Sequence, residues 1–278
     1  MKCTIVIVFY KQVIEESTTF RTLKEALLLN ERKLEELNLI LYDNSPDKQE
    51  AELSQYEGIS ISYVHDSRNL GITVAYNYAY QVAKKNGSNW LILLDHDSVL
   101  TPKYINEFLC FEVNNSTIAA IVPKINCENK MISPVYSQTL RPLHDEKPKA
   151  GLQDQPVMAI NSGALIRVDF LNEMGGFNED FPLDYLDHWL FYEIYARGYK
   201  VWVLEATLEH ELSVMDYSRV SFKRYKSILE SEIRFYQNYR RDLYNPYKTQ
   251  LAKRFLKQIL TVKNKQIALY TLRRLLSM

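Results

Sequence analysis

One stretch of nine residues, Trp90 to Ser98, constrains the fold most. Five bulky apolar residues run from Trp90 to Leu94, and two carboxylates, Asp95 and Asp97, follow one residue apart. A short unbroken apolar run is typical of a strand that is buried on both faces of a parallel sheet. Because an unpaired carboxylate is too costly to bury, both acids must lie where the strand leaves the sheet. In open α/β sheets, that carboxyl edge is where ligands bind.

The two carboxylates suit a metal site. Carboxylate oxygens are the ligands that hard divalent cations prefer, and a pair of them leaves room for a diphosphate on the far side of the ion. A helix N-cap or a solvated turn would also place Asp at these positions. The Asp-x-Asp triplet alone does not separate these interpretations, so the rest of the chain has to decide.

Strands and helices alternate through the first third of the chain. This alternation predicts a mostly parallel sheet with crossover helices. Three of the predicted strands end in acidic residues, which are Asp43, Asp66 and the pair after Leu94. Carboxylates that converge on one edge of a sheet are hard to explain as core. The predicted strands are residues 4–9, 39–42, 59–64 and 91–94, and the helices between them cover residues 20–37 and the segment from Gly71 to about Lys85.

The second half of the chain is less regular. Its segment 126–156 is polar and has no clear period, which predicts a loop-rich insertion or a pair of short edge strands. The other predicted strands are residues 118–123, 157–160, 164–168 and 199–204, and the predicted helices are residues 102–114, 184–197 and 217–241.

The segment from Lys248 to Met278 carries eight basic residues and no acidic one, with leucines and isoleucines at helical spacing. A basic amphipathic helix of this kind can lie on an anionic membrane surface. A helix that packs on the domain, or a dimer contact with a solvated basic face, explains the pattern as well. We therefore predict an α/β domain over residues 1–215 and a helical, basic amphipathic extension over residues 216–278.

Composition narrows the class of protein. Lys+Arg and Asp+Glu both number 34, so the net charge gives no sign of a nucleic-acid partner. The three cysteines have no metal-ligand spacing, which fits a reducing compartment. The apolar run at the N-terminus is too short for a signal peptide, and no run reaches the roughly 18 residues of a membrane span. We expect a cytoplasmic protein, with peripheral contact at the inner face of the cell membrane through residues 248–278.

Over residues 3–212 the chain resembles the inverting family 2 glycosyltransferases with the GT-A fold, a Rossmann-like α/β fold. The ordered set of motifs carries the resemblance. The forms Leu-Asp-x-Asp-Ser and Asn-Leu-Gly-Ile are most similar to the bacterial rhamnosyltransferases that use dTDP-rhamnose. The motifs are Ile5-Val6-Ile7-Val8-Phe9-Tyr10, Tyr42-Asp43-Asn44-Ser45, Asn69-Leu70-Gly71, Leu94-Asp95-His96-Asp97-Ser98, Asn161-Ser162-Gly163-Ala164, Gly175-Gly176-Phe177-Asn178-Glu179 and Gly198-Tyr199-Lys200-Val201.

The resemblance implies a nucleotide site and a metal site. Asp97 would bind Mg²⁺ or Mn²⁺ directly, with His210 as a further ligand, and the metal would neutralise the leaving diphosphate. A histidine ligand favours Mn²⁺ over Mg²⁺. Without the resemblance, His210 would be an ordinary surface or core histidine. The resemblance implies that Phe9, Tyr10 and Asp43 bind the nucleotide base and its ribose. Asp66, Arg68 and Asn69 would line the same pocket. Asp95 would face the ribose or the water shell of the metal.

Inversion at the sugar carbon needs one general base on the acceptor side. The family places it as the second acid of a pair at the start of a helix, and counting back from Gly198 gives Asp187. The sequence departs from the family here, because Leu186 precedes Asp187 and the competing candidate, Asp184, lies three residues earlier. The two acids are one helical turn apart and would share a helix face. Either acid could instead only stabilise the helix N-terminus.

The residues after Asp187 complete the implied acceptor side. His188 and Trp189 are expected to contact the acceptor sugar, although Trp189 suits a core position equally.

The expected activity is an inverting, metal-dependent transfer of a sugar, L-rhamnose from dTDP-rhamnose, onto a glycan or lipid-linked glycan acceptor in cell-surface polysaccharide synthesis. The alternatives are a transferase of the same family that uses a UDP-sugar of the glucosyl or galactosyl type, and a non-catalytic module that binds sugar nucleotides. A nucleotidyltransferase would usually have a glycine-rich phosphate loop after its first strand. Residues 10–14 contain no glycine, which argues against a nucleotidyltransferase. A homodimer is also compatible with the helical extension.

Overall fold

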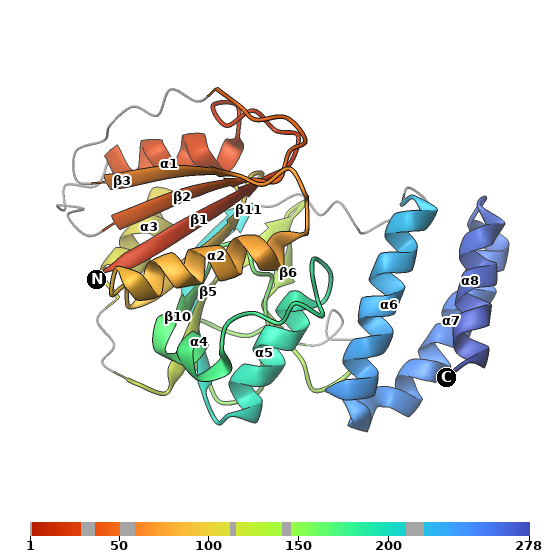
Figure 1. Cartoon of the computed structure of the whole chain (residues 1–278). Helices are drawn as coiled ribbons and strands as arrows, with labels where there is room; N and C mark the ends of the chain where they lie inside the picture. Colours follow the sequence, from red (N-terminus) through yellow and green to blue (C-terminus); the bar gives the residue numbers. More distant parts are fainter. Residues whose placement is uncertain (1, 29–36, 51–58, 112–114, 141–145, 210–219) are drawn as a thin grey trace.

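The computed structural model describes residues 2–28, 37–50, 59–111, 115–140, 146–209 and 220–278. Its centre is a sheet in the order β3-β2-β1-β4-β10-β5-β11-β8, with β6 paired to β5 (Figure 1). A second, two-stranded sheet pairs β7 with β9. The strands are β1 (Cys3–Phe9), β2 (Leu37–Asp43), β3 (Ile59–His65), β4 (Trp90–Asp95), β5 (Ile118–Cys127), β6 (Lys130–Ser133), β7 (Val135–Tyr136), β8 (Gly151–Gln153), β9 (Val157–Met158), β10 (Ala164–Arg167) and β11 (Lys200–Glu209). The helices are α1 (Thr18–Leu28), α2 (Ile72–Lys85), α3 (Pro102–Leu109), α4 (Val168–Met174), α5 (Leu186–Ala196), α6 (Phe222–Asn238), η2 (Arg241–Leu243), α7 (Tyr244–Thr261) and α8 (Lys265–Leu276).

The half of the sheet formed by β3, β2, β1 and β4 is parallel throughout. Its register aligns the strand ends, because Asp43 lies opposite both Phe9 and His65, and Asp95 lies opposite Val8. Parallel strands end at the same edge, so the acidic residues at the ends of β2, β3 and β4 meet there. The predicted α/β fold with a mostly parallel sheet is confirmed.

The other half of the sheet contains the antiparallel strands. β10 runs antiparallel between β4 and β5, with Ala164 opposite Leu93. The residues that precede β10 therefore lie beside the exit of β4, where the Gly163 amide donates to the Leu93 carbonyl oxygen at 2.8 Å. Residues 126–156 were predicted to form a loop-rich insertion or a pair of short edge strands, and the structure has three short strands there, β6, β7 and β8.

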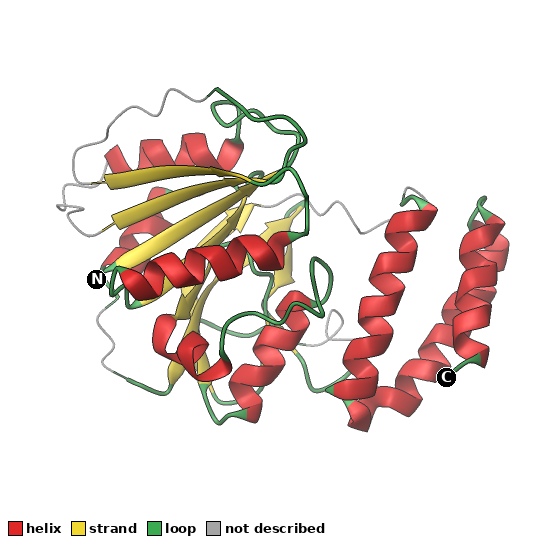
Figure 2. Cartoon of the chain, viewed as in Figure 1, coloured by secondary structure: helices red, strands yellow, loops and turns green. Residues whose placement is uncertain are grey.

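Helices cover both faces of the sheet and create two cores (Figures 1 and 2). Along β1, Val6 and Val8 pack on the face that carries α2, α4 and α5, whereas Ile5 and Ile7 pack on the face of α1 and α3. This alternation is the period of two that a strand imposes on its side chains. β1 and β4 are therefore apolar at nearly every position, as expected for a strand buried on both faces.

The last three helices lie together beside α5 (Figure 1). The sequence predicts one amphipathic helix over 248–278, but the structure contains two, α7 and α8, joined by residues 262–264. Asn264 caps α8, because its side chain accepts from the Gln266 amide at 3.1 Å. Pro246 lies in the first turn of α7, where its missing N–H costs no hydrogen bond. No helix in the described ranges is both long and apolar enough to cross a bilayer.

Candidate functional site

The turn that carries Asp95 and Asp97 is fixed through its main chain. The hydroxyl of Thr19, in the first turn of α1, lies 2.6 Å from the Asp95 carbonyl oxygen and accepts from the Ser98 amide at 2.8 Å. On the other side, the Asp95 amide donates to the Ser162 hydroxyl at 3.0 Å. The sequence analysis did not identify Thr19, because a threonine at the start of a helix gives no sign of a hydrogen-bond partner 76 residues away. These main-chain hydrogen bonds tie the turn to α1 on one side and to the segment before β10 on the other.

Asp43 is fully buried at the end of β2. Its Oδ1 accepts from the Ser45 amide at 2.9 Å, and its Oδ2 accepts from Gln49 and from the Tyr63 hydroxyl, both at 2.9 Å. These contacts make Asp43 the anchor of the loop after β2, and the predicted contact with a nucleotide base stays a prediction.

The two aromatic residues at the exit of β1 differ in exposure. Phe9 is fully buried in the core, and its carbonyl oxygen accepts from the Asn44 amide at 2.9 Å, so its predicted contact with a nucleotide stays a prediction. Tyr10 is 43% exposed and has a side chain that a ligand can reach.

Asp66, after β3, forms a compact group with Arg68 and Tyr42. Its two oxygens accept from Nε and Nη2 of Arg68, each at 2.7 Å, and the Tyr42 hydroxyl donates to it at 2.9 Å. The hydrogen bonds from Arg68 hold the pKa of the Asp66 carboxyl well below its ordinary value. Burial and the bond to Asp66 raise the pKa of Tyr42 to about 12, so its hydroxyl stays a donor at neutral pH. Asn69, predicted in the same pocket, adopts a left-handed backbone conformation with φ 47°.

The start of α2 is docked on the loop that leads to α5. A Cβ atom at Gly71, which has φ +96°, would lie 2.1 Å from the Pro182 carbonyl oxygen, so only glycine fits this contact. The Thr73 hydroxyl donates to the Phe181 carbonyl oxygen at 2.5 Å. One turn further on, Asn77 accepts from the Phe177 amide at 2.7 Å and donates to its carbonyl oxygen at 3.0 Å. Helix α2 therefore supports residues 177–182, the loop that leads to the predicted general base, Asp187.

Asp187 lies in the first turn of α5 and is half-buried, with its Oδ1 accepting from the His188 amide at 2.8 Å. The fully buried Tyr76 of α2 connects it with the strand-end acids. Burial, and then the charges of Asp95 and Asp187, raise the pKa of the Tyr76 hydroxyl well above its ordinary value. The charges of Asp95 and Asp187 therefore both act on the Tyr76 hydroxyl.

Asp184 does not share a helix face with Asp187. Tyr185 between them has φ 65°, a left-handed conformation that ends any helical continuity, and α5 begins after it. The Asp184 Oδ2 atom lies 2.5 Å from Nη1 of Arg224 on α6. Burial raises the pKa of the Asp184 carboxyl, although Arg224 opposes the shift. The expectation of a shared face is wrong, and Asp184 instead links the loop to α6.

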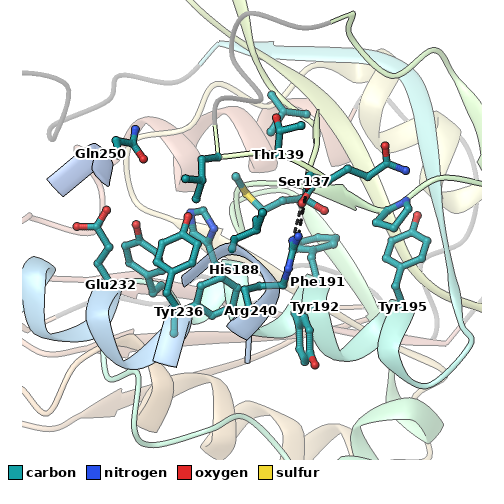
Figure 3. A pocket seen from close by; sticks show the side chains of 18 of the residues that line it. Ser137, Thr139, His188, Phe191, Tyr192, Tyr195, Glu232, Tyr236, Arg240 and Gln250 are labelled. Atoms are coloured by element: carbon teal, nitrogen blue, oxygen red, sulfur yellow. Dashed lines mark hydrogen bonds between the residues drawn. The ribbon is translucent and has the colours of Figure 1, made fainter. Parts of the chain in front are cut away.

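A cavity of about 720 Å³ lies where α5, α6 and α7 meet the segment around β7 (Figure 3). His188 lines it, as expected for an acceptor contact, and its ring stacks on Tyr185 at 4.4 Å between centroids. Trp189 is only 6% exposed and packs in the core, which favours its core alternative. The other aromatic residues that line the cavity are Phe191, Tyr192, Tyr195, Phe235 and Tyr236.

Two arginines fix the walls of this cavity. Arg240 donates to the carbonyl oxygens of Ser137 and Gln138, at 2.6 and 3.4 Å (Figure 3). Arg254 of α7 forms two parallel hydrogen bonds with Glu232 of α6, at 2.6 and 2.7 Å. Both charges of this pair are largely buried, and such a bidentate pair has the geometry that buried ion pairs need. Segments far apart in the sequence are thereby held around one cavity.

The residues predicted to bind a metal ion divide between described and undescribed parts of the chain. His210 lies outside the described residues, and within the described ranges no group of three or more His, Cys, Asp or Glu side chains could hold a metal ion. Asp95 and Asp97 nevertheless fit a Mg²⁺ or Mn²⁺ ion, because such ions are commonly held by one or two carboxylates together with substrate phosphates. The donor set suits an ion that arrives with a diphosphate.

Comparison with known proteins identifies the family. The sequence model of glycosyl transferase family 2 matches residues 4–175. The crystal structure of S. aureus TarS matches with a TM-score of 0.53 at 14% identity, over 87% of this chain and 45% of that chain. The structure of S. aureus TarS 1–349 in complex with UDP matches with a TM-score of 0.50 at 13% identity, over 90% of this chain and 78% of that one. These two likenesses show the fold, and the chain spans less than half the length of the first. None of the curated proteins compared with this chain matches it. By its family match, which spans more than half of the chain, the chain belongs to glycosyl transferase family 2.

Proposed function

We propose that this enzyme transfers a sugar, with inversion, from a nucleoside diphosphate sugar to a hydroxyl group of a glycan acceptor. One observation carries the proposal. The acids at the ends of β2, β3 and β4 share one sheet edge, and α2, which follows the Asp66 turn, is hydrogen-bonded to residues 177–182, which lead to Asp187. This packing supports a donor site and a base on neighbouring segments, as a single displacement requires.

In this mechanism, Asp187 accepts the proton of the acceptor hydroxyl. The hydroxyl oxygen attacks the anomeric carbon while the bond from that carbon to the diphosphate oxygen breaks on the opposite face. One displacement inverts the configuration, and no covalent intermediate with the enzyme forms. Asp184 is less suited to this role, because Arg224 already occupies its carboxylate.

Asp97 would hold the divalent cation directly, with His210 as the predicted further ligand, and Asp95 would face the ribose or the water shell of the metal. When bound, the cation supplies Lewis-acid stabilisation of the leaving diphosphate. The chain's own contribution is the main-chain clamp by Thr19 and Ser162, which fixes the turn before a ligand arrives.

The cavity beside α5 is the proposed acceptor site. Its volume of about 720 Å³ lies within the range of small-molecule sites, and its lining combines aromatic rings with a few polar groups. Aromatic faces are apolar and their hydroxyl or ring edges are polar, which suits a sugar ring with its own C–H and O–H groups. His188 borders this cavity and directly follows Asp187, so an acceptor bound here has its hydroxyl near the base.

The donor is proposed to be dTDP-rhamnose, on the motifs Leu94 to Ser98 and Asn69 to Ile72. A UDP-sugar is the alternative, and the structural likeness to a TarS complex with UDP favours it. The test is a thermal-shift series with dTDP, UDP and GDP, each with and without Mn²⁺. A metal-dependent shift that is largest with dTDP would support the rhamnose proposal. A preference for UDP would discard it and keep the transferase, whereas no shift with any nucleotide would contradict the proposed donor site.

A further inference from the structure

The outward faces of α7 and α8 carry apolar side chains that no described part of the protein covers. Leu256 and Leu260 on α7 are 61% and 84% exposed, and Leu269 and Leu276 on α8 are 64% and 79% exposed. Elsewhere in the described chain, only Leu28, at 72%, is a large apolar side chain with comparable exposure. Four such leucines on two adjacent helices are unusual for a surface that faces only water.

Loose packing of these helices does not explain the exposure, because their inner faces are tightly fixed. The Gln258 side-chain amide donates to the Tyr225 hydroxyl at 2.9 Å, and the Thr271 hydroxyl donates to Gln258 Oε1 at 2.8 Å. The hydroxyl groups of Tyr225 and Thr271 lie 2.5 Å apart. This closed ring of hydrogen bonds is buried and joins α6, α7 and α8. Because it fixes the rotation of α7 and α8, the leucines on the opposite faces are held outward.

The basic residues of the two helices divide in the same way. Arg254 and Arg274 pair with Glu232 and Glu230 of α6. Lys253, Lys257, Lys263 and Arg273 are exposed, in a segment without acidic residues. On α7, Lys253 and Lys257 lie one turn apart beside Leu256 and Leu260. The outward faces therefore combine exposed leucines with exposed basic side chains.

We propose that the outward faces of α7 and α8 dock on an anionic lipid bilayer, with the leucines at the acyl boundary and the lysines at the lipid phosphates. A second copy of the chain fits less well, because a two-fold contact would bring the same basic face against itself. The helices lie on the bilayer and do not cross it. This proposal does not rest on the proposed sugar donor or on the assignment of the base.

The test is co-sedimentation of the full chain with vesicles of phosphatidylcholine alone or with about a third phosphatidylglycerol. We expect pelleting with the anionic vesicles only, weakened by added salt. Leu256→Gln/Leu260→Gln/Leu269→Gln/Leu276→Gln should lower the bound fraction about tenfold. Leu28→Gln, an exposed leucine on α1, is the matched control and should bind like the wild type.

Circular dichroism and the thermal midpoint establish that the quadruple variant is folded. A second variant, Lys253→Gln/Lys257→Gln/Lys263→Gln, should lower binding and reduce its salt dependence. The proposal is overturned if the wild-type chain ignores anionic vesicles, or if the folded quadruple variant binds as well as the wild type. A wild-type dimer that ignores vesicles and dissociates in the quadruple variant would identify the face as a contact between copies.

Discussion

Two regions, the proposed donor edge at the ends of β1 to β4 and the proposed acceptor cavity beside α5, are built in different ways. At the donor edge, short hydrogen bonds to main-chain atoms and between neighbouring strand ends hold each group, as with Thr19 on the turn after β4. The cavity instead depends on rings and ion pairs contributed by α5, α6 and α7. The family match, at residues 4–175, covers the donor edge and the segment around β7 that lines the cavity, and it ends before α5, α6 and α7. We therefore expect donor chemistry to depend on the shared sheet, and acceptor recognition to depend largely on the three helices that lie outside the match.

The sharpest test of the donor edge is Asp97→Ala. We expect transfer to fall by about 10⁴-fold, because a metal that neutralises the leaving diphosphate is worth several kcal/mol. Metal-dependent nucleotide binding, measured by thermal shift, should be lost as well. Asp47→Ala, in the loop after β2, serves as a carboxylate control. Retained metal-dependent binding in Asp97→Ala would show that the cation is held elsewhere.

The corresponding change on the acceptor side is Asp187→Asn. The amide cannot take up the acceptor proton, so kcat should fall about 10³-fold, within the usual range for a general base. Nucleotide binding should be unchanged, which is the result that separates the two regions. If this variant keeps near-full turnover, Asp187 is not the base.

Tyr192→Leu probes the cavity without touching the donor edge. Removing one half-buried ring from the lining should raise the acceptor KM about tenfold, the equivalent of one aromatic contact, and leave the donor KM unchanged. Tyr270→Leu removes a ring from α8 outside the cavity and should leave both constants alone. Equal effects on both donor and acceptor constants would contradict the division between the regions.

Thr19→Val tests the main-chain clamp. The change leaves the Ser98 amide and the Asp95 carbonyl without their hydroxyl partner, which should cost about 1–3 kcal/mol in the free energy of unfolding. Urea denaturation measures this loss, and the donor KM should rise in parallel. Thr249→Val, whose hydroxyl contacts only its own helix, should change stability by less than about 0.5 kcal/mol.

The smallest expected effect concerns Arg68 and acid. Arg68 depresses the pKa of Asp66, so their interaction stabilises the fold above the ordinary aspartate pKa of about 3.9 and is lost as the pH falls below it. In Arg68→Ala, acid unfolding should therefore begin at a slightly higher pH. The shift is small because water screens Arg68, which is 67% exposed. Arg197→Ala removes another surface ion pair and controls for the change in net charge.

The donor edge could be predicted because strand periodicity is local and parallel strands bring their ends together. Asp43, Asp66 and Asp95 were placed at one edge on this ground alone, and the register confirms their position. What periodicity could not show is which of these groups are already hydrogen-bonded. Asp43 is engaged by Ser45, Gln49 and Tyr63, and only three-dimensional packing reveals this.

The acceptor side was harder to predict, because its contacts join distant segments. The pairing of Asp184 with Arg224 depends on a left-handed residue at position 185, and a tyrosine there gives no signal for it. The division of residues 248–278 into two helices was missed because the amphipathic pattern continues across residues 262–264 without a glycine or proline. The cavity is lined by residues from α5, α6 and α7 together, so the pattern of no single segment predicts it.

Gly71 shows how a residue without chemistry can be indispensable to both regions. It has no side chain to bind a ligand, yet any β-carbon would collide with the Pro182 carbonyl oxygen. In a saturation-mutagenesis map of activity, position 71 should tolerate no replacement, as a nucleophile or a metal ligand would. A ranking of sites by mutational intolerance would then place Gly71 among the catalytic residues, although its role is to let two backbones touch.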